Sequence, residues 1–406
     1  LHRRRHSFPT RRSSDLAFPG AVALVARRGK VVFAHALGHA QTVPVQRAMA
    51  LDTPFDLASL TKVVALTPLV LTLLEDGALS LDDAYARFVP EFAYRGKAEV
   101  TLRQLLAHTS GLPAWLPLYA SASSGAETLQ QLCDAELAYE PGTQVLYSDL
   151  GPILLGLLCE RLLGETLDRA VARRVLAPLG MTESGYRPDP TRRARAAATE
   201  VGNRFEAAMA EAHRQRLKLA PLTPRGGFRQ QLLVGEVHDG NAHHALQGVS
   251  GHAGLFGTAA DVLRWAQLFL NDGRAQSGAR VLSPATVAEA LSLQTAGLPM
   301  ARGLGFQLLR KGLLSKDEWG LAPAAVRLFP ASKLSFPSLR PYGDLLSGRT
   351  AGHTGFTGCS VAIDPERELA IVLCTNRVHP DADRFAIGVI RPRFHNAIAA
   401  SLVDSA

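Results

Sequence analysis

The chain has 406 residues, 47% of them hydrophobic, which is enough for one large core or two lobes. Its formal charge is +8, and residues 1–16 alone contain five Arg and one Asp. The segment 187–231 is also rich in Arg, but it lacks the interleaved aromatic residues expected of a nucleic-acid groove. The longest apolar run, about 63–74, is too short to span a membrane. Composition therefore favours a large globular protein that neither binds nucleic acid nor crosses a membrane.

The first residues differ in character from the rest. The stretch SFPTRRSSDL, residues 7–16, resembles the translation of a sequencing adapter. We expect residues 1–16 to be an artefact and exclude them from fold reasoning. The alternative is a genuine basic tail. If 1–16 is an artefact, we expect the native start, with any export signal, to be missing.

The first half of the chain begins with a strand pattern and continues with helical ones. Two apolar runs around Arg28-Gly-Lys predict a hairpin over 21–38. Further patterns predict helices over 59–76, 100–113, 126–138, 149–164 and 165–177. The segment 185–247 is weakly patterned and reads as a loop.

The second half returns to strands. Helices are expected at 258–273 and 283–294, with Thr258 and Ser283 as N-caps. A strand is expected at 304–310, a hairpin at 358–375 that pairs Ile363 with Ala370, and a helical tail over 381–404 with an early break at Pro392. We expect the two ends to share one sheet in a mixed lobe, 17–80 and 250–406. A mainly helical lobe, 81–249, would pack beside it and leave the site in a cleft between them.

The four cysteines give no metal motif, because no C-x-x-C spacing occurs. Cys133 and Cys159 lie in helical patterns and are expected in the core. Cys359 and Cys374 would face each other across the hairpin. Both a disulfide and a pair of core thiols remain open for them, and thiols are favoured.

Ser59 and Lys62 form the only S-x-x-K in the chain, where an apolar helix begins. Residues three apart share a helix face, so the hydroxyl and the amine can meet. A serine needs a base to become a nucleophile, and burial would lower the pKa of Lys62 so that its neutral amine could act as one. The alternative is that Ser59 only caps the helix and Lys62 reaches to water.

Two further motifs supply partners. Tyr147 and Asp149 follow a Pro-Gly turn and precede a helix, so Tyr147 could shuttle a proton. They could equally be a core tyrosine and a helix cap. Tyr342-Gly-Asp344 has the same spacing but lacks the following helix, so Tyr147 is preferred.

The sequence His353-Thr354-Gly355 stands at the entry to a strand. The first two side chains could hold a substrate carboxylate or carbonyl, and the glycine allows close approach. The backbone N–H of Phe356, with that of Ser59, could form an oxyanion hole. An ordinary turn is the alternative.

In this order, S-x-x-K, Y-x-D and H-T-G resemble the motifs of the serine β-lactamase and penicillin-binding protein superfamily. TPFDLASLTKV, VTLRQLLAHTSGLP, PGTQVLYSDLG and GHTGFTGCSVAIDPERELAIVLCTNRVHP resemble its class C-like serine hydrolases. The resemblance implies an α+β (mixed α/β) fold with an antiparallel sheet flanked by helices and an all-α lobe. It further implies that Ser59 is acylated, that Lys62 activates it and that Tyr147 is the second proton-transfer group. His353, Thr354 and Gly355 would line the cleft.

Two residues depart from that pattern. Asp149 stands where many members have Asn, so a negative charge would face the substrate. His353 replaces the lysine of K-T-G and would be only partly charged near neutrality, which weakens carboxylate anchoring. Both departures argue against an efficient β-lactamase. No E-x-x-L-N or G-x-S-x-G occurs, so a class A enzyme and an α/β-hydrolase are not indicated.

A histidine-rich segment lies between these motifs. GEVHDGNAHHALQGVSGHAG contains residues that could ligate a metal, but their spacing fits no familiar template. The resemblance includes its VHD-x-NA and GHAGLF parts, and we expect His238, Asp239, Asn241 and His252 to belong to a loop at the cleft.

The sequence therefore predicts an exported serine hydrolase without a cofactor. Its substrate would be a small molecule or muropeptide, namely a D-amino-acid amide, an ester or a β-lactam. One rival is a sensor that is acylated once by penicillin or a muropeptide and stops. Another is a metal-dependent hydrolase built on the histidines. The oligomeric state is open.

Overall fold

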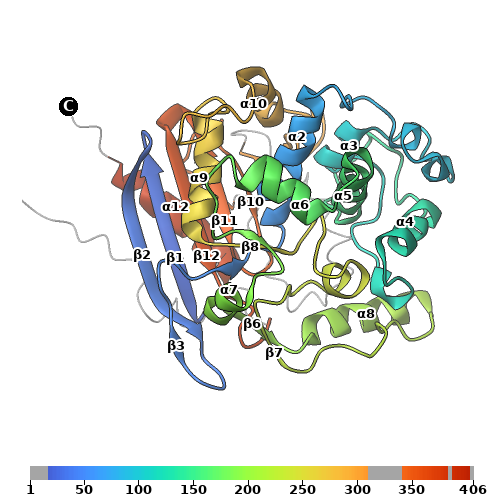
Figure 1. The fold of residues 1–406 in the computed structure, drawn as a ribbon, viewed down its shortest axis with the longest axis horizontal. Helices are drawn as coiled ribbons and strands as arrows, with labels where there is room; N and C mark the ends of the chain where they lie inside the picture. Colours follow the sequence, from blue (N-terminus) through green and yellow to red (C-terminus); the bar gives the residue numbers. More distant parts are fainter. Residues whose placement is uncertain (1–16, 310–340, 383–385, 403–406) are drawn as a thin grey trace, which may run out of the picture.

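The structure is a computed structural model that describes residues 17–309, 341–382 and 386–402. The predicted artefact at 1–16 lies outside these residues. A seven-stranded sheet in the order β3-β2-β1-β12-β11-β10-β9 joins the two ends of the chain, as expected (Figure 1). Its strands are β1 Gly20–Arg27, β2 Lys30–Gln41, β3 Arg47–Ala48, β9 Gln307–Leu308, β10 Ala351–Thr354, β11 Ser360–Asp364 and β12 Leu369–Thr375.

The interior strand β1 is buried on both faces, because its side chains alternate between two cores. Val22 and Leu24 belong to the main core, which also contains helix α9, Ala259–Leu270. Ala23 and Val25 face a second core with helix α12, Ile387–Ser401. The sheet therefore lies between helices, and the main core continues into the helical part of the molecule.

Several local predictions are confirmed. β1 and β2 form the first hairpin, and Ile363 pairs with Ala370 in the last one. Cys359 and Cys374 are both free and buried. Thr258 and Ser283 cap α9 and α10, Pro284–Leu291, through their side chains.

The helices predicted for the first half are present, mostly with shorter bounds. The helix after Ser59 starts as a π-helical turn, Lys62–Leu66, and continues as α2, Thr67–Glu75. The others are α3 Leu102–Ala107, α4 Gly125–Asp134, α5 Leu150–Leu163 and α6 Leu167–Val171, which continues as a π-helical turn, Ala172–Leu176. Short 3-10 turns lie at Tyr85–Arg87, Pro90–Ala93, Leu118–Ala120 and Pro365–Arg367.

Three predictions were wrong in part. The segment 185–247 is not a plain loop, because it holds β5 Gly185–Tyr186, α7 Pro190–Arg195, β6 Ala198–Val201, α8 Arg204–Leu217, β7 Leu232–Val234 and a π-helical turn Asn241–Ala245. Only three residues of α8 are buried, so its apolar stripe is too narrow to give a clear helical period. A strand was predicted over 304–310. Of the residues in this range that the structure describes, only the two of β9 form a strand.

The third error concerns Pro392, which lies inside α12 rather than breaking it. A proline removes one helical hydrogen bond. Ile390 and Phe394 are buried on either side of it, so packing against the sheet offsets that loss. The boundaries of the two lobes stay a prediction. None of the described helices has the length and apolar character needed to cross a bilayer.

A small three-stranded sheet brings together two segments that flank the candidate site. β8, Leu255–Gly257, lies between β4, Phe55–Asp56, and β5. The residues before Ser59 and those after His252 are thus neighbours, although about half of the chain separates them.

Candidate active site

A tight turn presents Ser59. Ala58, just before it, has a φ of +47°, a conformation that costs energy for any residue with a side chain. The buried Asp56 carboxylate holds this turn by accepting the N–H of Ala58 at 2.8 Å and that of His238 at 2.7 Å. Burial raises the pKa of Asp56, and the two N–H donors oppose that rise. Local strain and a buried carboxyl group therefore fix the direction of the serine.

Lys62 meets three acceptors. Its Nζ donates to Ser59 Oγ at 3.0 Å, to Asp149 Oδ1 at 2.7 Å and to the backbone oxygen of His252 at 3.1 Å. The residue is 1% exposed, so the alternative that it reaches to water does not hold. The hydroxyl and the amine lie together as the i, i+3 spacing predicts.

The expected direction of the Lys62 pKa was wrong. Burial by itself lowers the pKa, but the Asp149 carboxylate, with a smaller contribution from Tyr147, raises it above its ordinary value. The ion pair with Asp149 therefore favours the charged ammonium form of Lys62. Asp149 stands at the N-cap position of α5, but its side chain makes no capping hydrogen bond. Its charge pairs with Lys62 instead of facing a substrate alone.

Tyr147 lies among cations and imidazoles. Lys62 Nζ is 5.0 Å from the centre of its ring, and the Arg302 guanidinium is 5.4 Å from it. The rings of His108 and His353 are 4.6 Å and 5.7 Å away. The Tyr147 hydroxyl is buried and meets no partner at hydrogen-bonding geometry in the described part of the chain. An unpaired buried hydroxyl is costly, so any group that bonds to it would be favoured at this position.

The other Tyr-x-Asp motif lies elsewhere. Tyr342 is buried in the second core, and its ring is 5.8 Å from that of His395 in α12. Tyr147 is the tyrosine that the fold brings to Lys62.

His353 lies on β10 and is neutral, so the partial positive charge expected there was wrong. Burial lowers its pKa well below the ordinary value, and the charges of Arg302 and Lys62 add to that effect. Its Nδ1 lies 2.9 Å from the Thr354 carbonyl, which can only accept, so Nδ1 carries the proton. The other ring nitrogen, Nε2, can accept a hydrogen bond, but the side chain supplies no charge.

Arg302 and His108 are site residues that the sequence did not reveal. Arg302 is 6% exposed, and no carboxylate among the described residues pairs with its guanidinium. Burial lowers its pKa. His108 accepts the N–H of Ser148 at its Nδ1, 3.2 Å away, and burial lowers its pKa well below the usual range. No local pattern marks either residue, because only the fold brings them to Tyr147.

The turn after β10 lies against the nucleophile turn. A Cβ built on Gly355 would be 2.7 Å from the Leu57 carbonyl oxygen, so only glycine allows this approach. The ring of Phe356 is held by Arg377 at 4.3 Å, Phe205 at 4.6 Å and His238 at 5.6 Å. Within residues 17–309, 341–382 and 386–402, the backbone N–H groups of Ser59 and Phe356 donate to no other residue. Both are thus free to receive an oxyanion.

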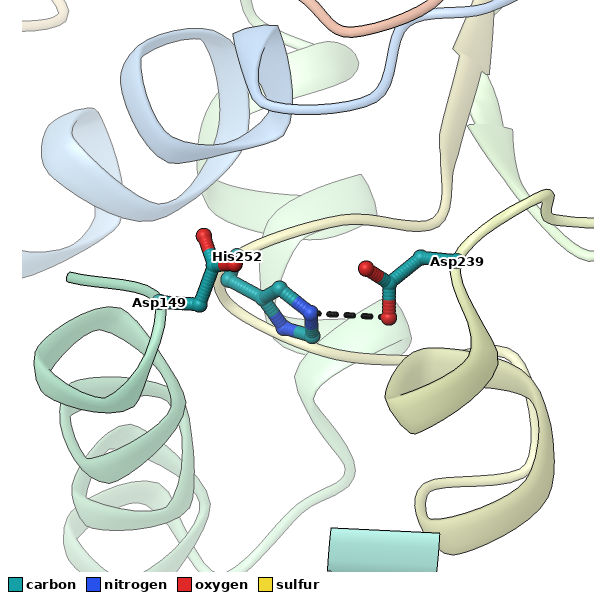
Figure 2. Close-up of side chains that lie close together, drawn as sticks. All are labelled: Asp149, Asp239 and His252. Atoms are coloured by element: carbon teal, nitrogen blue, oxygen red, sulfur yellow. Dashed lines mark hydrogen bonds and ion pairs between the residues drawn. The ribbon is translucent and has the colours of Figure 1, made fainter. Parts of the chain in front are cut away.

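The four residues predicted in the cleft loop have different neighbours. His238 is buried, and its ring pairs with Glu200 at 3.0 Å. Asn241 accepts the N–H of Tyr119 and donates to the Leu116 carbonyl, so it ties two segments together. Asp239 and His252 lie beside Asp149 (Figure 2).

This last group offers ligand atoms within 4.8 Å of one another and is the metal candidate among the described residues. Lys62 already donates to Asp149, and its positive charge opposes a metal cation there. The donor set therefore fits an ammonium better than a metal ion.

Comparison with known proteins places this geometry in a family. The family model described as Beta-lactamase matches residues 10–391. The chain belongs to the beta-lactamase family. The resemblance inferred from the motifs is thereby confirmed. Relatives of this member of the beta-lactamase family include other hydrolases.

Two relatives cover most of it. A candidate D-alanyl-D-alanine carboxypeptidase of Escherichia coli strain K12 is 29% identical over 91% of this chain and 81% of its own length. An N-acetylmuramyl-L-alanine amidase of Bacillus subtilis strain 168 is 30% identical over 89% of this chain and 78% of its own. A solved class C beta-lactamase shares the fold, with a TM-score of 0.65 and 18% identity over 96% of this chain and 92% of that one. The predicted α+β fold with an antiparallel sheet is confirmed.

Proposed function

We propose that this chain is a serine hydrolase that forms an acyl-enzyme at Ser59 and acts on a D-amino-acid amide of a muropeptide. The contact that carries the proposal is the 3.0 Å hydrogen bond between Lys62 Nζ and Ser59 Oγ at the start of a buried helical segment. A nucleophile within reach of a base, which is in turn oriented by a third group, is the arrangement that acyl transfer requires. Here Asp149 is that third group.

The steps follow from these positions. Ser59 Oγ attacks the carbonyl carbon while its proton passes to Lys62 in the neutral form. The N–H groups of Ser59 and Phe356 hold the oxyanion. The C–N bond then breaks as Tyr147 gives a proton to the leaving amine. Tyr147 regains a proton from Lys62. Water then attacks the ester while Lys62 takes its proton, and Lys62 returns this proton to Ser59 Oγ as the acid product leaves.

Arg302 supports a substrate with a free carboxylate. A buried guanidinium without a carboxylate partner is unfavourable unless an anion joins it. Arg302 lies 5.4 Å from the ring of Tyr147, whereas the neutral His353 cannot supply a charge. Release of a C-terminal D-amino acid matches this chemistry better than hydrolysis of a neutral ester. The name of the Escherichia coli relative agrees with such a substrate.

The test is a substrate panel. A peptide ending in D-Ala-D-Ala, the same peptide with a C-terminal amide, a p-nitrophenyl ester and nitrocefin are assayed with the wild type and with Ser59→Ala. We expect the free-acid peptide to be cleaved fastest and nitrocefin slowly, and Ser59→Ala to lose all four activities. Full turnover by Ser59→Ala would exclude the mechanism.

The sensor alternative is decided by burst kinetics with a labelled penicillin. Continued turnover after the burst is the expected result, whereas one stoichiometric burst without turnover would identify a sensor. We further propose that the enzyme works in the bacterial cell envelope, where muropeptides occur. Fractionation of the source cells with an antibody against the chain would test this.

A further inference from the structure

The segment from Asp239 to His252 accepts a hydrogen bond from the proposed catalytic lysine. The backbone oxygen of His252 accepts a hydrogen bond from Lys62 Nζ at 3.1 Å, and this contact is buried. An ammonium has three donors, and Lys62 has three acceptors here. The neutral amine would have two donors and one lone pair. If the two donors stay on Asp149 and His252, the lone pair points at Ser59.

The direction of that carbonyl is fixed by the ring of the same residue. His252 Nε2 lies 3.0 Å from Asp239 Oδ1, and His252 Nδ1 lies 2.7 Å from Ser250 Oγ. His252 is 1% exposed, so both ring nitrogens are satisfied inside the protein. A ring held at two points cannot rotate without breaking one of these bonds.

The protonation pattern follows from the partners. Burial acts to raise the pKa of Asp239, but the His252 interactions and the N–H of Ala242 outweigh it and lower the pKa below the ordinary value. The ionised carboxylate can only accept, so His252 Nε2 donates to it, and His252 Nδ1 shares a hydrogen bond with the Ser250 hydroxyl. Figure 2 shows the ring of His252 between Asp239 and the side of the site where Asp149 lies.

The backbone around His252 has little freedom. A Cβ on Gly251 would be 2.1 Å from the Pro152 carbonyl oxygen of α5, so the loop lies directly on that helix. Asp149, at the start of α5, is the other acceptor of Lys62. The two acceptors are therefore set by one packed unit, α5 with the loop on it.

We propose that Ser250, His252 and Asp239 form a positioning array that orients the Lys62 amine toward Ser59. The proposal rests on the acyl-transfer function of Ser59 and Lys62. It gives a role to the VHD-x-NA and GHAGLF segments. None of the three side chains needs to touch the substrate.

The serine, histidine and aspartate order also resembles a catalytic triad, and the test must separate the two roles. Ser250 is 3% exposed and its carbonyl accepts the Tyr186 hydroxyl at 3.0 Å, so it is held in the interior. A nucleophile needs an accessible hydroxyl. The array is therefore assigned to positioning.

The experiment measures the acylation rate of Ser59 directly. Wild type, Asp239→Asn, Ser250→Ala and the control His243→Gln react with a fluorescent penicillin and, separately, with a fluorophosphonate probe. His243 lies in the same segment and its ring contacts His244. We expect Asp239→Asn to slow acylation by about 100-fold, because displacement of a catalytic group has an effect of that size. Ser250→Ala should slow acylation less, and His243→Gln should match the wild type. Penicillin KM should change little in all of them.

Each other outcome is informative. Equal acylation rates for folded Asp239→Asn and wild type would overturn the positioning role. A rise in KM alone would also overturn it, because that result indicates substrate binding. Label found on Ser250 in Ser59→Ala would make the array a second nucleophilic centre instead. If the wild type is not labelled at Ser59 at all, the proposed function itself fails. Thermal unfolding of each variant shows which of them are folded, and Ser250→Ala is the milder change if Asp239→Asn does not fold.

Discussion

At the scale of single residues, the charge on Lys62 is decided by one neighbour. Burial and the Asp149 carboxylate act on its pKa in opposite directions, and the carboxylate prevails. The 2.7 Å contact in a buried site is strong because little water screens it. A lysine can thus be buried and still charged at rest, and the neutral amine that the proposed mechanism needs forms more readily as the pH rises.

Asp149→Asn should shift the pH dependence of catalysis. Without the carboxylate, burial would lower the Lys62 pKa, so the neutral amine would form at lower pH. We expect the acidic limb of the kcat/KM profile to move to lower pH. Profiles between pH 5 and pH 10 would measure this.

Asp344→Asn is the matched control, because Asp344 belongs to the other Tyr-x-Asp motif and interacts with Asn396. It should leave the profile in place. An acidic limb that stays unmoved in Asp149→Asn, or moves to higher pH, would show that Asp149 does not set the Lys62 charge.

At the scale of elements, the site depends on contact between two turns from opposite ends of the chain. The Thr357 hydroxyl donates to the Asp56 carbonyl at 2.8 Å, beside the close approach of Gly355 to Leu57. Arg391 of α12 donates to the Gly358 carbonyl at 3.0 Å. The sheet and α12 therefore hold the turn after β10 against the residues that precede Ser59.

Gly355→Ala should damage catalysis by separating these turns. Its methyl group would meet the Leu57 carbonyl oxygen at 2.7 Å, and one turn would have to shift. Loss of one oxyanion donor typically lowers kcat by about 100- to 1000-fold. Steady-state kinetics on the cleaved peptide would measure the loss.

Gly348→Ala provides the comparison, because a Cβ there meets nothing within 4 Å. We expect it to keep wild-type kcat. If Gly355→Ala did so as well, the turn would not carry an oxyanion donor.

At the scale of the whole molecule, several buried or half-buried histidines link stability to pH. The pKa values of His243, His244 and His395 are lowered to about 4, mainly by burial. A histidine that is harder to protonate in the folded state favours unfolding as the pH falls below its unfolded pKa. Glu206 acts in the opposite direction, since burial raises its pKa to about 8.

His395→Leu isolates one of these contributions. With a folded pKa of about 4, His395 should cost the wild type about 2 kcal/mol of stability between pH 7.5 and pH 5. The variant should lose correspondingly less over that interval. Urea unfolding at both pH values would give the difference.

His35→Gln, at an exposed position on β2, gives the baseline for the comparison. An identical loss of stability in wild type and His395→Leu would mean that His395 is not buried in the neutral form.

Sequence patterns predicted features that depend on neighbours along the chain. The i, i+3 spacing placed Ser59 beside Lys62, alternation and turn chemistry set the pairing of Ile363 with Ala370, and Thr258 marked a helix start. Each of these follows from backbone geometry over a few residues. The prediction of a loop where α8 lies failed, because only a narrow stripe of that helix is buried and its helical period is therefore weak.

Features that depend on distant partners required the tertiary structure. Asp149 lies 87 positions from Lys62 and reverses the expected direction of its pKa. Arg302 reaches Tyr147 and helps to keep His353 neutral, and no local pattern announces it. The sequence by itself determined which side chains could do chemistry. The tertiary structure decided their charges, because in a buried site a charge is set by whichever groups the fold brings within a few ångströms.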